Sequence, residues 1–112
     1  MSETRRLLDL ELSEAAYQTT IVDLAKTLRW TVFHVHDSRA MAEGFPDLLL
    51  IRPPQLVFLE VKAENGRATP AQMAVLALLR RCPQVTALLV RPSDWEAVKR
   101  LLTRSGPPSR SM

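Results

Sequence analysis

Residues 44–62 read GFPDLLLIRPPQLVFLEVK, and this stretch decides the fold. Two apolar runs flank a proline pair, which is the pattern of two strands joined by a tight turn. Counting outward from the turn along an antiparallel hairpin places Asp47 directly opposite Glu60. Opposed residues have Cβ atoms about 5 Å apart, and the period of two in a strand puts Lys62 on the same side as Glu60. The pattern therefore predicts two acids and a base on one patch of the sheet.

Two carboxylates at this separation repel, so that either one carries a proton or a cation lies between them. Mg²⁺ prefers oxygen ligands and commonly takes only one or two protein carboxylates beside water and substrate phosphate. We therefore expect Asp47 and Glu60 to bind Mg²⁺ or Mn²⁺, with Lys62 positioning the attacking water or stabilising the phosphorane. A Glu-x-Lys motif alone is more often a solvated strand edge with a weak ion pair. Here the flanking runs are almost wholly apolar, which is typical of strands covered on both faces.

Two predicted helices add polar side chains to this patch. A helix from the N-cap Ser13 to about residue 28 carries Glu14 and Gln18 on the same stripe as its apolar residues, which suggests the rim of a site, although Glu14 also suits the first turn of any helix. A second helix begins at Thr69-Pro70, where Gln72 occupies the capping-box position. Capping alone would explain Gln72, and a role in the site is the competing interpretation.

Candidates for DNA contact lie in the loops. Residues 30–36 alternate as a strand that ends at His36, and the following loop, residues 37–43, carries Arg39. Arg67 lies in a second turn-rich loop after Lys62. We expect these three side chains and Gln18 to contact DNA; ordinary structural or solvated roles for the histidines and arginines are the alternative.

Size and composition indicate one domain, residues 1–104, followed by a tail at 105–112 whose Ser, Pro and Arg content predicts disorder. The formal charge of +3 is compatible with a polyanionic partner without requiring one. The single cysteine, Cys82, excludes an internal disulfide. No apolar run approaches the length of a membrane span and no secretory signal begins the chain, so we expect a cytoplasmic location, in a bacterial or phage-infected cell.

The order of predicted elements is helix, three strands, helix, strand, helix. It indicates an α/β protein in which a mixed sheet of about four strands is flanked by helices, the arrangement of the restriction-endonuclease-like core. The strand after the second helix, residues 85–90, should lie parallel to the strand that carries Glu60, because a helical crossover joins the two.

The motifs Gly44-Phe45-Pro46-Asp47 and Glu60-Val61-Lys62, followed by Gln72, resemble the VRR-NUC (virus-type replication-repair nuclease) branch of the PD-(D/E)xK superfamily. The resemblance covers roughly residues 12–102. It implies a divalent-metal-dependent nuclease, whose small stand-alone members are often homodimers that act on branched DNA such as Holliday junctions or flaps.

The resemblance also implies site roles beyond the acid pair. It assigns a metal-site role to Glu14, a catalytic-site role to Gln72, and a metal contact to the carbonyl of Val61. Two other functions stay open: a catalytically silent DNA-binding or scaffold module that keeps the nuclease fold, and a restriction-type enzyme that reads a fixed duplex sequence. The second is weakened by the small size of the chain, which leaves little protein for base readout.

Overall fold

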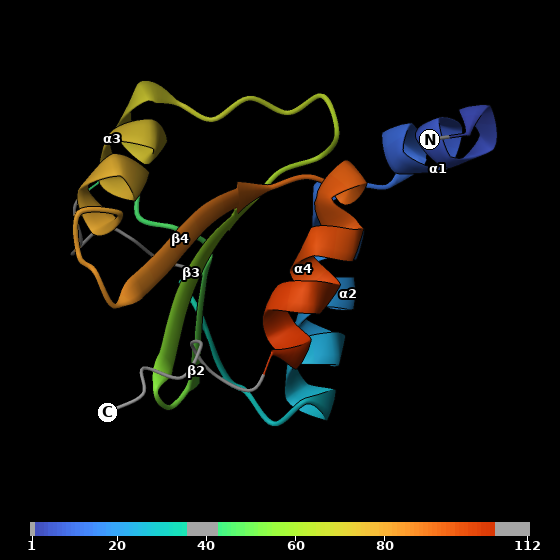
Figure 1. Ribbon diagram of the computed structural model, residues 1–112. Helices are drawn as coiled ribbons and strands as arrows, with labels where there is room; N and C mark the ends of the chain where they lie inside the picture. The colour runs from blue at the N-terminus through green and yellow to red at the C-terminus, as the bar shows by residue number, and fades with distance from the viewer. Residues whose placement is uncertain (1, 36–42, 105–112) are drawn as a thin grey trace.

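The computed structural model describes residues 2–35 and 43–104, and it places a four-stranded sheet between helices (Figure 1). The elements in chain order are α1 (Glu3–Glu11), α2 (Glu14–Thr27), β1 (Thr31–His34), β2 (Leu48–Arg52), β3 (Gln55–Val61), α3 (Pro70–Leu79), β4 (Val85–Val90), the short 3-10 helix η1 (Pro92–Asp94) and α4 (Trp95–Thr103). The predicted α/β architecture, a mixed sheet flanked by helices and compatible with a restriction-endonuclease-like core, is confirmed.

The sheet has the strand order β1-β2-β3-β4. Strands β1, β2 and β3 are antiparallel neighbours, whereas β4 runs parallel to β3 after the crossover through α3, as expected. In the β2–β3 hairpin, Ile51 pairs with Leu56 and Leu48 pairs with Leu59, which is the register counted from the proline turn.

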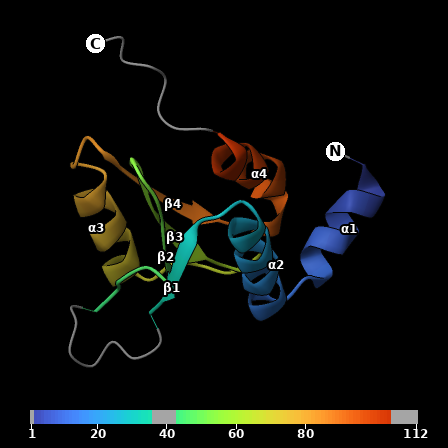
Figure 2. The ribbon, with the colours of Figure 1, turned by 90° about the horizontal axis from the view of Figure 1, so that it is seen from below.

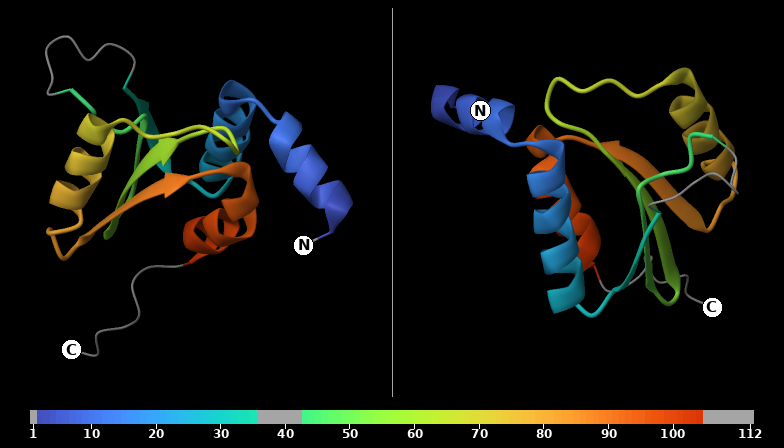
Figure 3. Two further views of the ribbon diagram at one scale, coloured as in Figure 1. Left: turned by 90° about the horizontal axis from the view of Figure 1, so that it is seen from above. Right: turned by 180° about the vertical axis from the view of Figure 1, so that it is seen from behind.

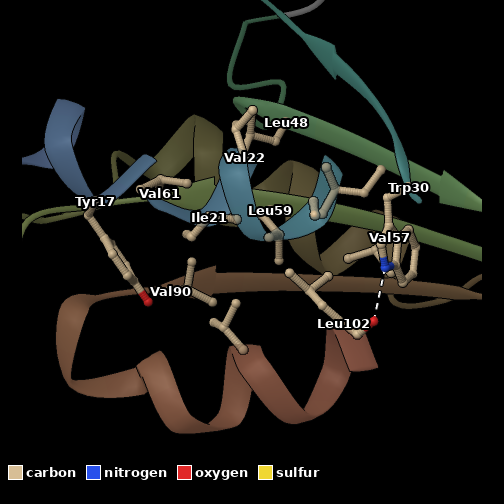
Figure 4. Packing of buried hydrophobic residues seen from close by; sticks show 13 residues of the cluster. Tyr17, Ile21, Val22, Trp30, Leu48, Val57, Leu59, Val61, Val90 and Leu102 are labelled. Carbon is tan, nitrogen blue, oxygen red and sulfur yellow. Dashed lines mark hydrogen bonds between the residues drawn. The ribbon is translucent and has the colours of Figure 1, made fainter. Parts of the chain in front are cut away.

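Helices α2 and α4 cover one face of the sheet and α3 covers the other (Figures 1 and 2). Alternate residues of each strand point to opposite faces, so β3 directs Val57, Leu59 and Val61 toward α2 and α4. These three side chains belong to the main core, which Figure 4 shows filled from the sheet and both helices. Phe58 points the other way and packs with Leu76 of α3 in a smaller cluster.

Trp30 anchors the C-terminal end of α4. Its side chain is 4% exposed, and its indole Nε1 donates a hydrogen bond to the carbonyl of Leu102 at 3.0 Å (Figure 4). The guanidinium of Arg52 lies 4.7 Å from the centre of the Trp30 ring and donates to the carbonyl of Leu28 at 2.9 Å. The hairpin turn, the end of α2 and the end of α4 are thus connected through one buried indole.

Three features differ from the sequence-based expectations. Helix α1 was not predicted; Ser2 caps it by accepting from the backbone N–H of Arg5, and the helix lies beside α2 and away from the sheet (Figure 2). Strand β1 is shorter than the expected 30–36, and η1 precedes the last helix. His36, Arg39 and the tail at 105–112 lie outside the described residues. Within the described residues, no helix combines the length and apolar character needed to cross a bilayer.

Candidate active site

Asp47 lies at the point where the chain enters β2, across from the end of β3. The ladder ends at the pair of Leu48 with Leu59, so the next position along each strand brings Asp47 next to Glu60. A direct contact supports this placement: the carboxylate Oδ2 of Asp47 accepts a hydrogen bond from the backbone N–H of Val61 at 2.9 Å. Asp47 is therefore tied to the β3 backbone beside Glu60, as the hairpin count predicts.

Glu60 is a buried acid with an incomplete set of partners. Its side chain is 1% exposed; Oε2 accepts from the amide Nε2 of Gln72 at 3.0 Å and lies 3.5 Å from the ammonium Nζ of Lys62. The other oxygen, Oε1, is buried and has no hydrogen-bond partner among the described residues. Burial, followed by the charge of Asp47, raises the pKa of Glu60 from 4.5 to about 7, whereas Lys62 acts in the opposite direction.

Gln72 has both of the roles that the sequence leaves as alternatives, helix capping and a contact in the site. Its amide Oε1 accepts from the backbone N–H of Thr69 at 2.9 Å, and the Thr69 hydroxyl accepts from the backbone N–H of Gln72 at 3.1 Å, which completes a capping box. The amide nitrogen of the same side chain donates to Glu60. The α3 cap therefore holds Gln72 in the orientation in which it contacts the acid, so that capping and site geometry are parts of one arrangement.

The Gly-Phe-Pro segment, which precedes Asp47, passes close to the start of α3 (Figure 3, right). Gly44 has φ +92°, and a Cβ added there would lie 2.5 Å from the carbonyl carbon of Ala71 and 2.8 Å from the backbone nitrogen of Gln72. Phe45 packs edge to face on Phe58 with ring centres 5.6 Å apart. Only a residue without a side chain allows this approach, and it brings the turn before Asp47 to the helix that carries Gln72.

The two candidates on α2 are placed differently from each other. Glu14 is exposed in the first turn of α2, and no described contact links it to Asp47 or Glu60. Gln18 is half-buried, and its Nε2 lies 3.3 Å from Nδ1 of His34 on β1. The metal-site role of Glu14 and the DNA contact of Gln18 stay predictions.

His34 is a residue near the site that the sequence-based set of candidates omits. It pairs with Leu48, the residue after Asp47, and the backbone N–H of the next residue, Val35, donates to the Asp47 carbonyl at 2.9 Å. The histidine therefore lies on the edge strand one pair away from Asp47, but its side chain is on the α2 face with Gln18, whereas the acid pair is on the α3 face. Its alternation with Trp30 and Val32 was visible in the sequence, but the sequence favoured His36, which lies outside the described residues.

The loop that follows Lys62 is hydrogen-bonded to residues that come directly after the C-terminal end of β4. Arg91 donates to the carbonyl of Gly66 at 2.9 and 3.3 Å from two of its nitrogens, and Glu64 accepts from the backbone N–H of Ser93 at 2.9 Å. Arg67 is an exposed residue of this loop. Its position on an anchored loop is compatible with the predicted DNA contact, which nothing here tests.

The donor set fits one hard divalent cation. Asp47 and Glu60 supply carboxylate oxygens, and the buried, unpartnered Oε1 of Glu60 is an acceptor that a cation would satisfy. Within residues 2–35 and 43–104, no three His, Cys, Asp or Glu side chains are grouped so that they could hold a metal ion. Two carboxylates suffice for Mg²⁺, which keeps several water ligands and completes its octahedron with substrate oxygens. A metal contact by the Val61 carbonyl stays a prediction.

The comparison with protein families agrees with this geometry. A family model described as the VRR-NUC domain matches residues 5–92, a range that contains Asp47, Glu60, Lys62 and Gln72. Among curated proteins, none matches the chain. The family match extends over more than half of the sequence and includes all four strands of the sheet. The chain therefore belongs to the VRR-NUC family, a family of nucleases.

Proposed function

We propose that the protein is a DNA endonuclease that hydrolyses phosphodiester bonds with Mg²⁺ or Mn²⁺ and selects branched DNA such as four-way junctions or flaps. The observation that carries the proposal is the acid pair at the end of the β2–β3 hairpin. Glu60 is 1% exposed, adjoins a second carboxylate, and keeps one oxygen without a hydrogen-bond partner among the described residues. Such a costly arrangement is expected where a cation is to be bound.

Each residue of the site has a distinct task in this reaction. Asp47 and Glu60 would hold the ion, and the Val61 N–H and the Gln72 amide hold these two carboxylates in place. The ion, when bound, supplies a water of lowered pKa and neutralises charge on the phosphoryl oxygens. Lys62 orients the attacking water or stabilises the phosphorane. The water oxygen bonds to phosphorus as the bond to the departing sugar oxygen breaks, and that oxygen takes up a proton.

DNA as the substrate follows from the family and is supported by the charge of +3. Each chain offers one acid pair, so two symmetrical nicks in a four-way junction need two chains related by a twofold axis. We therefore propose a homodimer on branched DNA. Arg67, together with Arg39 and His36 from outside the described residues, is proposed to contact the phosphate backbone.

The test is a cleavage panel with four DNA substrates of matched sequence: a four-way junction, a flap, a splayed duplex and a linear duplex. Each is incubated with Mg²⁺, Mn²⁺ or EDTA, and the protomer number is measured from the solution mass. The variant Asp47→Asn keeps an oxygen that can accept from Val61 N–H, whereas alanine would leave that donor unpaired at a cost of about 1–3 kcal/mol. Asparagine is therefore the cleaner substitution.

We expect metal-dependent cleavage of the branched substrates, and a fall of at least about 10³-fold in Asp47→Asn. The matched control is Asp23→Asn, the same change at an exposed position of α2, which should cleave like the wild type. Activity retained by folded Asp47→Asn, or equal activity in EDTA, would show that the acid pair is not the catalytic centre. A wild-type chain that binds junctions without cutting them under any metal would instead be a silent DNA-binding module.

A further inference from the structure

A cavity that is open to solvent lies on the side of the molecule away from α3. It has a volume of about 270 Å³ and is lined by residues of α1, α2, η1 and the start of α4. Figure 2 shows these helices as neighbours. Its apolar wall consists of Leu8, Leu12, Pro92 and Trp95. None of these residues belongs to the acid pair or contacts it, so the cavity is separate from the proposed nuclease site.

Two polar side chains that line this cavity are buried without full hydrogen bonding. Asp9 is 7% exposed and its Oδ2 has no partner among the described residues; Tyr17 is 1% exposed and its hydroxyl is equally unpartnered. Buried polar atoms are normally satisfied, because an unmade hydrogen bond is costly. Two such atoms on residues that line one cavity point to a ligand with hydrogen-bonding groups, and the carboxylate oxygen of Asp9 needs a donor.

The arginine at the cavity does not supply that donor. Arg5 lies with Nε 3.9 Å from Oδ1 of Asp9, beyond hydrogen-bond distance, and its Nη2 is 3.5 Å from Glu96. Its side chain is 45% exposed, so it stands at the mouth of the cavity rather than over the unpartnered oxygen. Oδ2 of Asp9 is thus left without a partner even with Arg5 in place.

The electrostatic field in the cavity favours a cation. Burial raises the pKa of Tyr17, and the charges of Asp94, Asp9 and Glu64, in that order, raise it further. Three carboxylates, from α1, from η1 and from the loop after Lys62, therefore act on the hydroxyl. A cation that donates N–H groups would satisfy both these charges and the hydrogen bonds.

The aromatic residues supply the complementary apolar contact. Tyr17 and Trp95 pack edge to face with ring centres 6.3 Å apart and an interplanar angle of 75°. The ammonium of Lys99 lies 5.7 Å from the centre of the Trp95 ring, which shows that this indole already carries a cation–π contact. A ligand with an apolar body could rest against the Trp95 and Leu12 side of the wall.

We infer that the cavity binds a small organic cation, an amidinium, guanidinium or alkylammonium group on a compact apolar body. Its N–H groups donate to Asp9 Oδ2 and to the Tyr17 hydroxyl oxygen, and its apolar part packs against Leu8 and Trp95. The group can come from a free amine or guanidine, or from an arginine side chain of a partner protein, because both present the same chemistry.

The first test uses benzamidine as the cation, titrated into the full chain in EDTA and followed by the amide NMR signals. We expect saturable binding with Kd of about 1 mM or tighter, a range typical of a small ligand in a fitting cavity, and signal shifts at residues 5–12 and 93–95. Neutral benzamide has nearly the same shape and should bind at least about 10-fold more weakly. Binding of benzamide as tight as that of benzamidine would overturn the inference.

Variants locate the cation. Asp9→Asn keeps the size of the side chain and should weaken benzamidine about 10-fold or more, and Tyr17→Phe should weaken it several-fold. Asp23→Asn on the exposed side of α2 is the matched control and should bind like the wild type. Failure of the wild type to bind, or unchanged binding in folded Asp9→Asn, would refute the site. Loss in Asp47→Asn instead would place the cation on the acid pair.

Two further ligands distinguish the sources. Agmatine presents a free guanidinium, and the capped peptide acetyl-Leu-Arg-Leu-amide presents the same group as a side chain. Tighter binding of the peptide assigns the cavity to a partner protein, and tighter binding of agmatine assigns it to a free small molecule. Because no metal or DNA is present, this result is independent of the cleavage panel, and either experiment can fail without the other.

Discussion

The two faces of β3 are built from adjacent residues, yet they differ in what they contribute. One face directs Leu59 and Val61, both fully buried, into the main core under α2 and α4. The other face directs Phe58 into a small cluster under α3 and ends at Glu60, a buried acid with an unpartnered oxygen. Burial of apolar side chains on the first face offsets the conformational entropy that is lost on folding. The fold can therefore tolerate a buried acid at the end of the second face, although its burial is unfavourable.

The largest effect is expected from the core face. Leu59→Ala removes a side chain with no exposed surface and should lower the free energy of unfolding by about 3–5 kcal/mol, measured by urea denaturation. The matched control is Leu88→Ala on β4, where 37% of the residue is exposed and the cost should be clearly smaller. Leu88 pairs with Leu59 on the same face, so equal losses in the two variants would show that burial does not set the cost at these positions.

A smaller effect is expected where the site face meets α3. Gly44→Ala forces a φ of +92° on alanine and places its Cβ 2.5 Å from the Ala71 backbone, so we expect a loss of about 2–3 kcal/mol. Cleavage by the remaining folded protein should also fall, because the turn before Asp47 can no longer rest on α3. Urea denaturation and the junction assay measure the two effects.

Gly66→Ala is the control for that prediction. Its Cβ would lie 3.2 Å from the Ala63 carbonyl oxygen, a tight contact that a small shift relieves, so the cost should stay below about 1 kcal/mol. If Gly44→Ala were as mild as Gly66→Ala, the close approach of the Gly-Phe-Pro segment to α3 would not be essential to the site.

The acid at the end of the site face predicts how stability depends on pH. The pKa of Glu60 is raised in the folded protein from 4.5 to about 7, so between these values the folded state binds more protons than the unfolded state. Stability without metal should therefore fall as pH rises through this window, by up to about 3 kcal/mol, and level off above it. Urea denaturation in EDTA at pH 4.5 to 8 measures the slope.

Glu60→Gln isolates this contribution. The amide keeps the shape of the side chain but does not titrate, so the difference from the wild type should grow with pH and favour the variant near pH 8. Mg²⁺ should stabilise the wild type and leave Glu60→Gln almost unchanged, because only the ionised pair attracts the cation. A variant that is less stable than the wild type at pH 8 in EDTA would show that Glu60 stabilises the fold.

The site face was largely predictable from the sequence because its geometry is local. A proline turn fixes the register of a short hairpin, so the position of Asp47 relative to Glu60 follows from counting. The α3 cap was equally readable in Thr69-Pro70-Ala71-Gln72. What the count could not show is that the Gln72 amide turns toward Glu60, since this depends on how α3 packs on the sheet.

Features that depend on long-range packing could not be predicted from the sequence. The contact of Gln18 with His34 joins residues on two elements whose spacing carries no signal for it. Helix α1 leaves Leu7 and Leu8 more than half exposed, so its place in the fold is not set by burial of an apolar face in the core. The cavity between α1 and Tyr17 depends on the docking of that helix and was therefore equally hidden.

The smallest effect is expected from two variants at the start of α3, which distinguish capping of that helix from positioning of Glu60. Thr69→Ala removes the hydroxyl that accepts from Gln72 N–H and should cost about 1 kcal/mol of stability with little change in cleavage. Gln72→Ala removes the reciprocal cap at a similar cost and also frees Glu60, so cleavage should fall about 10-fold and more Mg²⁺ should be needed for half-maximal activity. Equal cleavage by both variants would reduce Gln72 to a helix cap, whereas a fall in Gln72→Ala alone shows that the Gln72 amide positions Glu60 independently of the Thr69 hydroxyl.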